Sequence, residues 1–255
     1  MTLVLKPGYS FDSDASTYID AVETADGQAL ETGVRVAIND FVLGCKTDGI
    51  WDAIKASCIL AGARTLEGAL VPLVGTAPTN YNFVSGDYNR ETGLVGDGST
   101  KYLDSNRAVN ATPSSNIHAS VFQTTSQAPL NRQFFGAETG GAQIFQVSTG
   151  PVDTNGRAFG RQVSVEYNTA FSLIGISNTS IELTGRGAGI NSVSTAAFVS
   201  ATMSNNIFLF ARNQNAPNGH INARLAFYSI GESLDLAALD TRVSNLITAI
   251  GAAIP

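Results

Sequence analysis

Residues 231–235 read Gly-Glu-Ser-Leu-Asp and place a serine between a predicted strand and a predicted helix. That is the setting of the nucleophile of α/β-hydrolases, where a sharp turn exposes the serine hydroxyl. The hydrolase motif has Gly at its last position, and this chain has Asp235 there. Ser233 or Asp235 is therefore expected to cap the following helix, because both side chains accept hydrogen bonds from free helical N–H groups.

Two glycine-rich segments superficially resemble phosphate-binding loops. In residues 93–101 the order after Gly98 is Ser-Thr-Lys, the reverse of the phosphate-loop order, and a strand follows. A phosphate loop leads into a helix whose N-terminus faces the anion, so this segment is predicted to be a hairpin turn. Residues 185–189 also precede no helix and are predicted to form a flexible loop.

Side chains that ligate metals are few. The chain has two histidines. His118 alternates with apolar residues and His220 follows a turn glycine, so both are expected to face solvent. Residues 153–156 begin like a calcium loop but lack the later bidentate Glu. The sequence therefore predicts no metal site and no cofactor.

The two cysteines, Cys45 and Cys58, are too few for a disulfide scaffold or a four-cysteine zinc site. Both fall on apolar stripes of predicted helices, so buried, reduced thiols are expected. Their separation also permits a disulfide between adjacent helices, although nothing in the sequence requires one.

Polar side chains between the predicted strands provide candidate contacts for a glycan or a protein partner. They are Arg132, Arg157, Arg161 and Tyr167. Arginine and tyrosine can hydrogen-bond sugar hydroxyls, but the same residue types also keep a surface soluble. The sequence leaves both interpretations open.

The elements that must position these residues change in kind along the chain. Residues 12–70 are predicted to be helical, because apolar residues recur there at helical spacing. The three stripes contain Tyr18, Ile19 and Val22, then Val34, Ile38, Phe41 and Cys45, then Trp51, Ile54, Cys58 and Ala61. A last helix carries Leu236, Leu239, Val243, Leu246, Ile247 and Ile250 on one face and is expected to stop at Gly251.

From about residue 78 to 230, short alternating runs separated by Gly, Asn and Pro predict strands. The predicted strands are 80–84, 100–103, 117–125, 133–137, 143–148, 162–167, 171–177, 181–184, 207–212 and 223–230. The expected fold is mainly β with helical additions, an antiparallel β-sandwich of jelly-roll type. Residues 1–75 are predicted to form an arm and helical segment, and residues 76–255 the sandwich with its C-terminal helix.

Composition excludes several classes of function. Of 255 residues only 14% are charged, and the net charge is −6. Nucleic-acid binders need a basic face, so nucleic acid is not an expected partner. No uninterrupted apolar stretch reaches the ~18 residues that span a bilayer, and the start lacks the features of a secretory signal.

Two blocks of this sequence resemble a known family. Residues 93–105, GLVGDGSTKYLDS, and residues 224–235, RLAFYSIGESLD, are similar to the entry strand and the last strand of concanavalin A-like (laminin G-like) sandwich domains carried by tailed-phage proteins. Residues 21–73 resemble the helical lead-in of such virion proteins. The resemblance implies a virion component, assembled in the host cytoplasm, rather than a particular chemistry.

Three functions follow as hypotheses. The favoured one is a structural protein of a tailed-phage virion, a capsid decoration or tail-associated knob. Its partners would be other virion proteins and its own copies, with a trimer expected by analogy alone. The alternative is a carbohydrate-binding host-recognition module, an adhesin or tail fibre, that holds a host surface glycan on an aromatic-floored groove.

The third hypothesis, a glycan-degrading enzyme, is disfavoured. Glucanases of this fold typically carry their acids on a Glu-x-Asp-x-Glu strand, and the chain has no such strand. Glu138, Glu166 and Glu182 are isolated in sequence. Glycosidases need two carboxyl groups roughly 5 to 9.5 Å apart, so the chain is not expected to be an enzyme.

Overall fold

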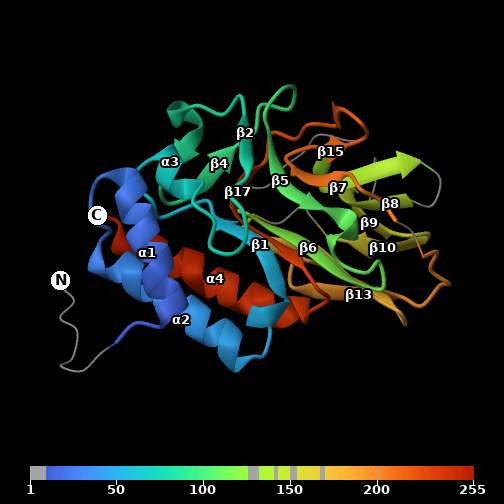
Figure 1. The fold of residues 1–255 in the computed structure, drawn as a ribbon, viewed down its shortest axis with the longest axis horizontal. Coiled ribbons are helices and arrows are strands. Elements are labelled where there is room, and N and C mark those ends of the chain that lie inside the picture. Colours follow the sequence, from blue (N-terminus) through green and yellow to red (C-terminus); the bar gives the residue numbers. More distant parts are fainter. Residues whose placement is uncertain (1–9, 126–131, 141–142, 150–153, 167–169, 201) are drawn as a thin grey trace.

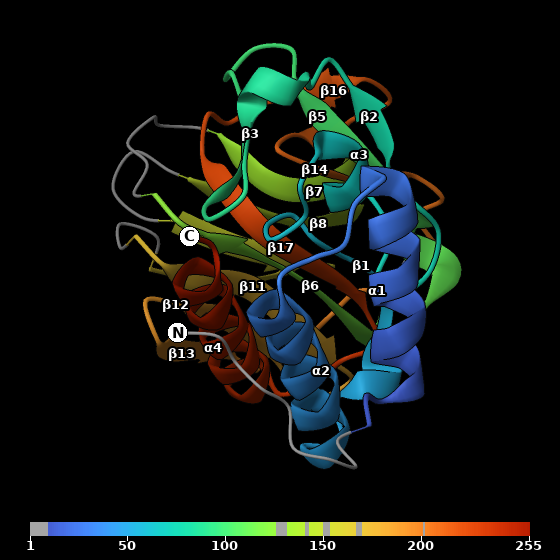
Figure 2. The ribbon, with the colours of Figure 1, turned by 90° about the vertical axis from the view of Figure 1, so that its left-hand side faces the viewer.

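Two β-sheets packed face to face form the body of the molecule, and helices cover the outer face of one of them (Figures 1 and 2). The computed structural model describes residues 10–125, 132–140, 143–149, 154–166, 170–200 and 202–255. The predicted fold class, an antiparallel sandwich with a C-terminal helix, is confirmed. Each of the ten predicted strands overlaps an observed one.

Within the described residues the first sheet has eight strands. Its order is β13 (Ile190–Ser194), β12 (Leu183–Gly187), β11 (Ser172–Thr179), β6 (Asn116–Gln123), β17 (Arg224–Gly231), β4 (Gly93–Val95) and β3 (Tyr88–Asn89), and β1 (Ile54–Ile59) also pairs with β17. Every pair in this sheet is antiparallel. Strand β17, near the end of the sequence, therefore pairs with β1, β4 and β6, which all lie in its first half.

The second sheet, again counted over the described residues, has nine strands. Its order is β10 (Arg161–Val165), β9 (Thr154–Ala158), β8 (Gln143–Thr149), β7 (Gln133–Gly140), β14 (Asn206–Leu209), β5 (Tyr102–Ala108) and β2 (Thr79–Tyr81), with β15 (Arg212–Asn213) and β16 (Pro217–Asn218) beside β7. Its pairs are antiparallel except for a single parallel bridge between β15 and β7.

The helices are α1 (Ser13–Asp26), α2 (Thr32–Thr47), α3 (Leu66–Ala69) and α4 (Leu236–Ala253), with single 3-10 turns at Trp51–Ala53, Ser85–Asp87 and Val109–Ala111. Helix α1 begins after Asp12, whose carboxylate accepts from the Asp14 N–H, and ends at Gly27 in the left-handed conformation. Asp235, not Ser233, caps α4 by accepting from two backbone N–H groups.

The hydrophobic core has two layers because the eight-stranded sheet is buried on both sides. One layer lies between the sheets and includes Phe135, Val147 and Leu209. The other lies between the eight-stranded sheet and helices α1, α2 and α4 (Figure 2). There Phe41 of α2 meets Phe227 of β17 edge to face, with ring centroids 5.6 Å apart.

Several predicted elements differ from the structure. The third helix is wrong, because residues 54–59 form strand β1. Residues 54–58 alternate apolar and polar side chains, but Ile54, Cys58 and Ala61 are also spaced as on one face of a helix, so this short run fits both patterns. Gly251 does not stop α4, which runs on to Ala253.

The two glycine-rich segments also differ from the prediction. Residues 93–101 are not a hairpin turn, since β4 belongs to the eight-stranded sheet and β5 to the nine-stranded one. Residues 185–187 belong to strand β12 rather than to a flexible loop. A Cβ on Gly187 would lie 1.8 Å from the carbonyl oxygen of Glu166, so the glycine permits β12 to approach the segment after β10.

Candidate functional site

The outer face of the nine-stranded sheet carries a continuous row of side chains. Because successive strand residues point to opposite faces, inward residues such as Leu103 alternate with outward ones. The outward row crosses seven strands in register through Thr79, Asp104, Phe208, Gly136, Gln146, Arg157 and Gln162. No helix packs on this row in the way that α2 and α4 cover the other sheet (Figures 1 and 2).

An aromatic cluster occupies the β2–β5–β14 end of this face. Tyr81 and Tyr102 lie opposite each other in register, and their rings stack with centroids 4.3 Å apart and planes at 5°. Phe208 contacts Tyr102 at 4.7 Å, and the His220 ring lies 6.0 Å from it. Tyr102 and Phe208 are buried, whereas Tyr81 is 40% exposed. Tyr81 therefore presents a supported aromatic surface to solvent.

Two polar atoms beside this cluster have no hydrogen-bond partner among the described residues. They are Oε1 of Gln133 and Nε2 of His220, and both are buried. Gly219, which precedes His220, packs against Gln133: its carbonyl accepts from the Gln133 N–H, and a Cβ on Gly219 would lie 2.7 Å from Cγ of Gln133. Buried polar atoms without partners are uncommon and costly; both side chains would have to turn outward to meet a ligand hydroxyl.

The electrostatics of His220 keep its ring neutral at physiological pH. Burial lowers its pKa below the ordinary value, and the positive charge of Arg132 acts in the same direction while Asp97 opposes it. A neutral imidazole has one donor and one acceptor nitrogen. His220 can therefore exchange one hydrogen bond in either direction with a hydroxyl.

A polar network continues the face toward β8. Arg212 forms an ion pair with Glu138 and donates to Oε1 of Gln146 at 3.1 Å and to Oε1 of Gln214 at 3.0 Å. The Nε atom of Arg212 is buried without a partner among the described atoms. The Glu138 carboxylate is thus neutralised within the chain.

The four predicted contact residues have different positions. Arg157 is exposed on the row and donates to Oε1 of Gln162, and Arg132 precedes β7 close enough to influence His220. Arg161 is buried, and its guanidinium donates to Asn178 and to the carbonyls of residues 179, 180, 181 and 196. Tyr167 lies outside the described residues. The structure therefore associates Arg132 and Arg157 with this face and leaves Arg161 no free donor for a ligand.

The prediction that His118 faces solvent is wrong. The connection from β17 to α4 covers it, and its ring bonds to Oγ of Ser229 at 2.7 Å and to the carbonyl of Glu232. Burial lowers the pKa of His118 to about 4. A serine hydroxyl beside a histidine is a possible nucleophile and base, but both side chains are completely buried and cannot meet a substrate.

The acidic residues weighed as hydrolase candidates lie on separate elements. Glu138 is on β7, Glu166 follows β10, and Glu182 lies between β11 and β12. Glu182 does line a shallow hollow of about 310 Å³ with Asp235 at the start of α4. In the part of the chain that the structure describes, no three His, Cys, Asp or Glu side chains could hold a metal ion together.

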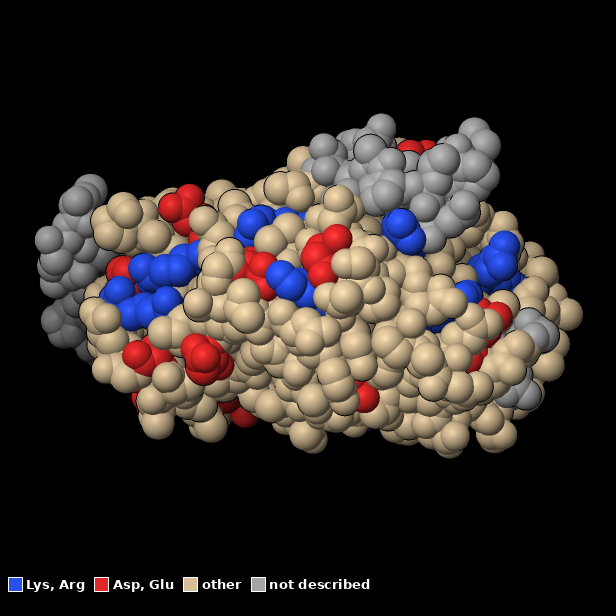
Figure 3. All heavy atoms as spheres, turned by 90° about the horizontal axis from the view of Figure 1, so that it is seen from above, with Lys and Arg blue, Asp and Glu red and all other residues tan. Residues whose placement is uncertain are grey.

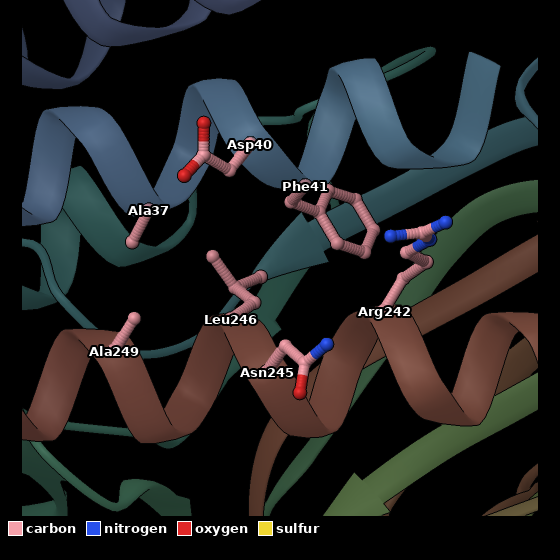
Figure 4. A pocket seen from close by; sticks show the side chains of 7 residues that line it. All are labelled: Ala37, Asp40, Phe41, Arg242, Asn245, Leu246 and Ala249. Carbon is pink, nitrogen blue, oxygen red and sulfur yellow. The ribbon is translucent and has the colours of Figure 1, made fainter. Parts of the chain in front are cut away.

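The helical side has a hollow of its own. Figure 4 shows a groove of about 200 Å³ between α2 and α4, with Phe41 and Leu246 at its floor and Asp40, Arg242 and Asn245 around it. Arg242 is bound in an ion pair with Asp48. No helix of the described chain is long and apolar enough to cross a bilayer.

Charges of both signs lie side by side on the face drawn in Figure 3. Seen from above, Lys and Arg side chains alternate with Asp and Glu, and wide uncharged areas separate them (Figure 3). Polyanions require a one-signed basic surface. The site with the most distinctive chemistry on the described surface is therefore the uncharged aromatic cluster.

Comparison with known proteins defines the fold only. No protein-family model and no curated protein matches the chain. Among solved structures, Trypanosoma rangeli sialidase with 2,3-difluorosialic acid matches with a TM-score of 0.50 at 8% identity, over 92% of this chain and 38% of that one. The receptor-binding domain of botulinum neurotoxin mosaic serotype C/D has a TM-score of 0.49 at 10% identity, over 76% of this chain and 50% of that one.

This chain therefore spans half or less of the length of either protein. At such identities the similarity to the sialidase is one of fold. It agrees with the β-sandwich described above.

Proposed function

We propose that this chain is a virion protein of a tailed phage that binds a host surface carbohydrate on the outer face of its nine-stranded sheet and does not cleave it. The observation that carries the proposal is the exposed Tyr81 ring, stacked on the buried Tyr102, beside polar atoms of Gln133 and His220 that have no partner among the described residues.

The chemistry of this face suits a sugar ring. A pyranose has an apolar C–H face and a rim of hydroxyls, and a tyrosine offers a rigid amphipathic surface at low entropic cost. Tyr81 would take the C–H face, while Gln133 accepts from one hydroxyl and His220 binds another. Binding would then pair two atoms that are orphaned in the free protein.

The carboxylates on this face favour binding over hydrolysis. Glu138 is held by Arg212, and Asp104 accepts from the Asn106 N–H at 2.8 Å and from the Asn206 side chain at 3.2 Å. A glycosidase needs one carboxyl group that keeps its proton and a second that attacks or activates water. Because Glu138 and Asp104 already accept hydrogen bonds from side chains or backbone of this chain, they support the sheet face and are not available as catalytic acids.

The virion part of the proposal rests on the sequence blocks at residues 93–105 and 224–235 and on the layered architecture. The helices occupy the face opposite the aromatic cluster (Figure 2). This arrangement allows the helical side to attach to the particle while the aromatic face points outward. The similarity of fold to a sialidase is compatible with it but does not choose the ligand.

The test is a glycan array followed by calorimetry with the best ligand, comparing the wild type with Tyr81→Ala. Loss of a supported aromatic surface is expected to weaken binding roughly tenfold or more. Phe171→Ala is the matched control, because Phe171 is similarly exposed, at 44%, but packs on Phe122 of the eight-stranded sheet. Equal loss in both variants, or no loss in Tyr81→Ala, would contradict the assigned face.

The virion assignment is tested separately. Antibodies raised against the chain should label intact, purified phage particles at a fixed position in electron micrographs. Labelling of infected-cell lysate with no labelling of particles would reject the virion role and leave the carbohydrate face standing.

A further inference from the structure

A third hollow, of about 230 Å³, lies where β1 approaches the end of β5, away from the aromatic cluster. It is lined by Lys55, Ala56, Gly75, Thr76, Ser105, Asn106, Arg107, Ala108 and Ala111. Residues from three separate stretches of the chain thus meet there. A water molecule occupies about 30 Å³ in the liquid, so the hollow has room for a small polyatomic group.

The two cations in this lining are incompletely paired. Lys55 contacts Oε1 of Glu232 at 3.2 Å. Among the residues that the structure describes, the guanidinium of Arg107 has one contact, a marginal bond of 3.5 Å from Nη2 to the Ala111 carbonyl, and its Nε is buried without a partner. Burial lowers the pKa of Arg107, and the negative charge of Glu232 opposes this shift. Lys55 and Arg107 therefore share a single carboxylate.

The backbone holds Arg107 in this position. Asn106 adopts a positive φ of 54° and its side chain donates to the Ala77 carbonyl and to Oγ1 of Thr79, which anchors β5 to the segment before β2. The Arg107 N–H donates to Oγ of the buried Ser105. The guanidinium is therefore presented by fixed backbone rather than by a free loop.

We propose that this hollow is an oxyanion-binding pocket, in which Arg107 and Lys55 hold a carboxylate, sulfate or phosphate group. The planar guanidinium matches two oxygens of such a group, and an ammonium adds a point charge beside it. Burial lowers the pKa of Arg107, which reflects the cost of holding its charge away from water. A bound anion would offset that cost.

The pocket is independent of the carbohydrate face. The anion could be free sulfate or phosphate, or the acid group of a charged sugar, and these sources share the same recognition chemistry. Inorganic sulfate and glucuronate are the two probes, with glucose as the uncharged match for glucuronate.

The experiment is an NMR titration of the whole chain at constant ionic strength. Sulfate should shift the amide signals of residues 105–108, and Arg107→Gln should weaken binding roughly tenfold or more. Arg107→Lys keeps the positive charge but loses the planar guanidinium that can bind two oxygens, so an intermediate affinity for sulfate is expected. Glucuronate binding that glucose does not share would identify an acid sugar as a ligand, whereas sulfate binding alone would identify a free anion.

Glu232→Gln supplies a test of opposite sign. Removing the competing carboxylate should strengthen sulfate binding several-fold, an effect that a purely structural Arg107 would not produce. The matched control is Arg35→Gln, because Arg35 is also an ion-paired cation but lies on α2.

Sulfate binding that is equal in the wild type and in a folded Arg107→Gln or Arg107→Lys variant would overturn the proposal. So would equal weakening by Arg35→Gln, which would indicate general ion screening. The proposal would also be overturned if neither sulfate nor glucuronate shifted any amide signal of the wild type.

Discussion

At the scale of single residues, whether another segment covers a sheet face determines whether the polar side chains on that face are buried or exposed. His118 and Arg157 both point away from the inter-sheet core, and sequence alternation treats them alike. His118 is sealed beneath the β17–α4 connection, whereas Arg157 is exposed. Alternation identifies which residues share a face, but it cannot say whether a later segment covers that face. For this reason His118 was mispredicted.

His118 should make stability depend on pH. Its folded pKa, about 4, lies below the ordinary value of 6.5, so the unfolded chain binds more protons between these values. Its contribution to the free energy of unfolding is therefore complete above about pH 6.5 and falls by roughly 3 kcal/mol as the pH drops toward 4. Urea unfolding of the wild type at pH 7.5 and pH 4.5 measures this loss.

His118→Gln removes the titrating group and should flatten the pH dependence in this window while lowering stability at pH 7.5. His220→Gln is the comparison variant. Because the His220 ring is less buried, it should account for a smaller part of the pH dependence of stability. A pH dependence that is unchanged in His118→Gln would show that carboxylates dominate it.

At the scale of elements, periodicity predicted most strands, including central strands buried on both faces, and failed for one short run that also fits helical spacing. Helices α1 and α2 and the last strand and helix follow directly from their apolar spacing and caps. Strand β1 was predicted as a helix because Ile54, Cys58 and Ala61 are also spaced as on one helix face. Strands β9 and β13 were missed, since polar residues and glycines dominate them.

The glycines of β12 are predicted to be essential to the packing of the two sheets. Gly187→Ala would place a methyl group against the Glu166 carbonyl, which belongs to rigid backbone. The expected loss is about 1–3 kcal/mol in the free energy of unfolding. Gly86→Ala is the control, because no atom lies within 4 Å of its Cβ position and its φ is not positive.

Denaturant titrations of the two variants provide the measurement. A Gly187→Ala protein as stable as Gly86→Ala would mean that β12 moves away from β10 at little cost. That outcome would also remove the explanation given for the glycine-rich sequence of residues 185–189.

At the scale of the whole molecule, the helices and the sandwich share a core, as Phe41 and Phe227 illustrate. We therefore predict that they unfold together. Trp51, the only tryptophan of the chain, lies beside the helical layer, so its fluorescence reports on that layer while far-UV circular dichroism also follows the sheets. The two signals should give coincident unfolding curves.

Phe41→Ala should lower stability by about 3–5 kcal/mol and keep the curves coincident. If fluorescence changed at lower denaturant than circular dichroism, the helical segment would be an independent unit. The proposed boundary near residue 75 would then describe folding as well as sequence.

The position of β17 has a consequence for biosynthesis. Its register joins Ile54 to Gly231 and Val121 to Tyr228, so β1 and β6 cannot complete their pairing until β17 has been synthesised. Contacts between such distant parts of a chain form slowly, and the waiting strands expose apolar edges meanwhile. We therefore expect the nascent polypeptide to be prone to aggregation until β17 has left the ribosome and paired with β1 and β6.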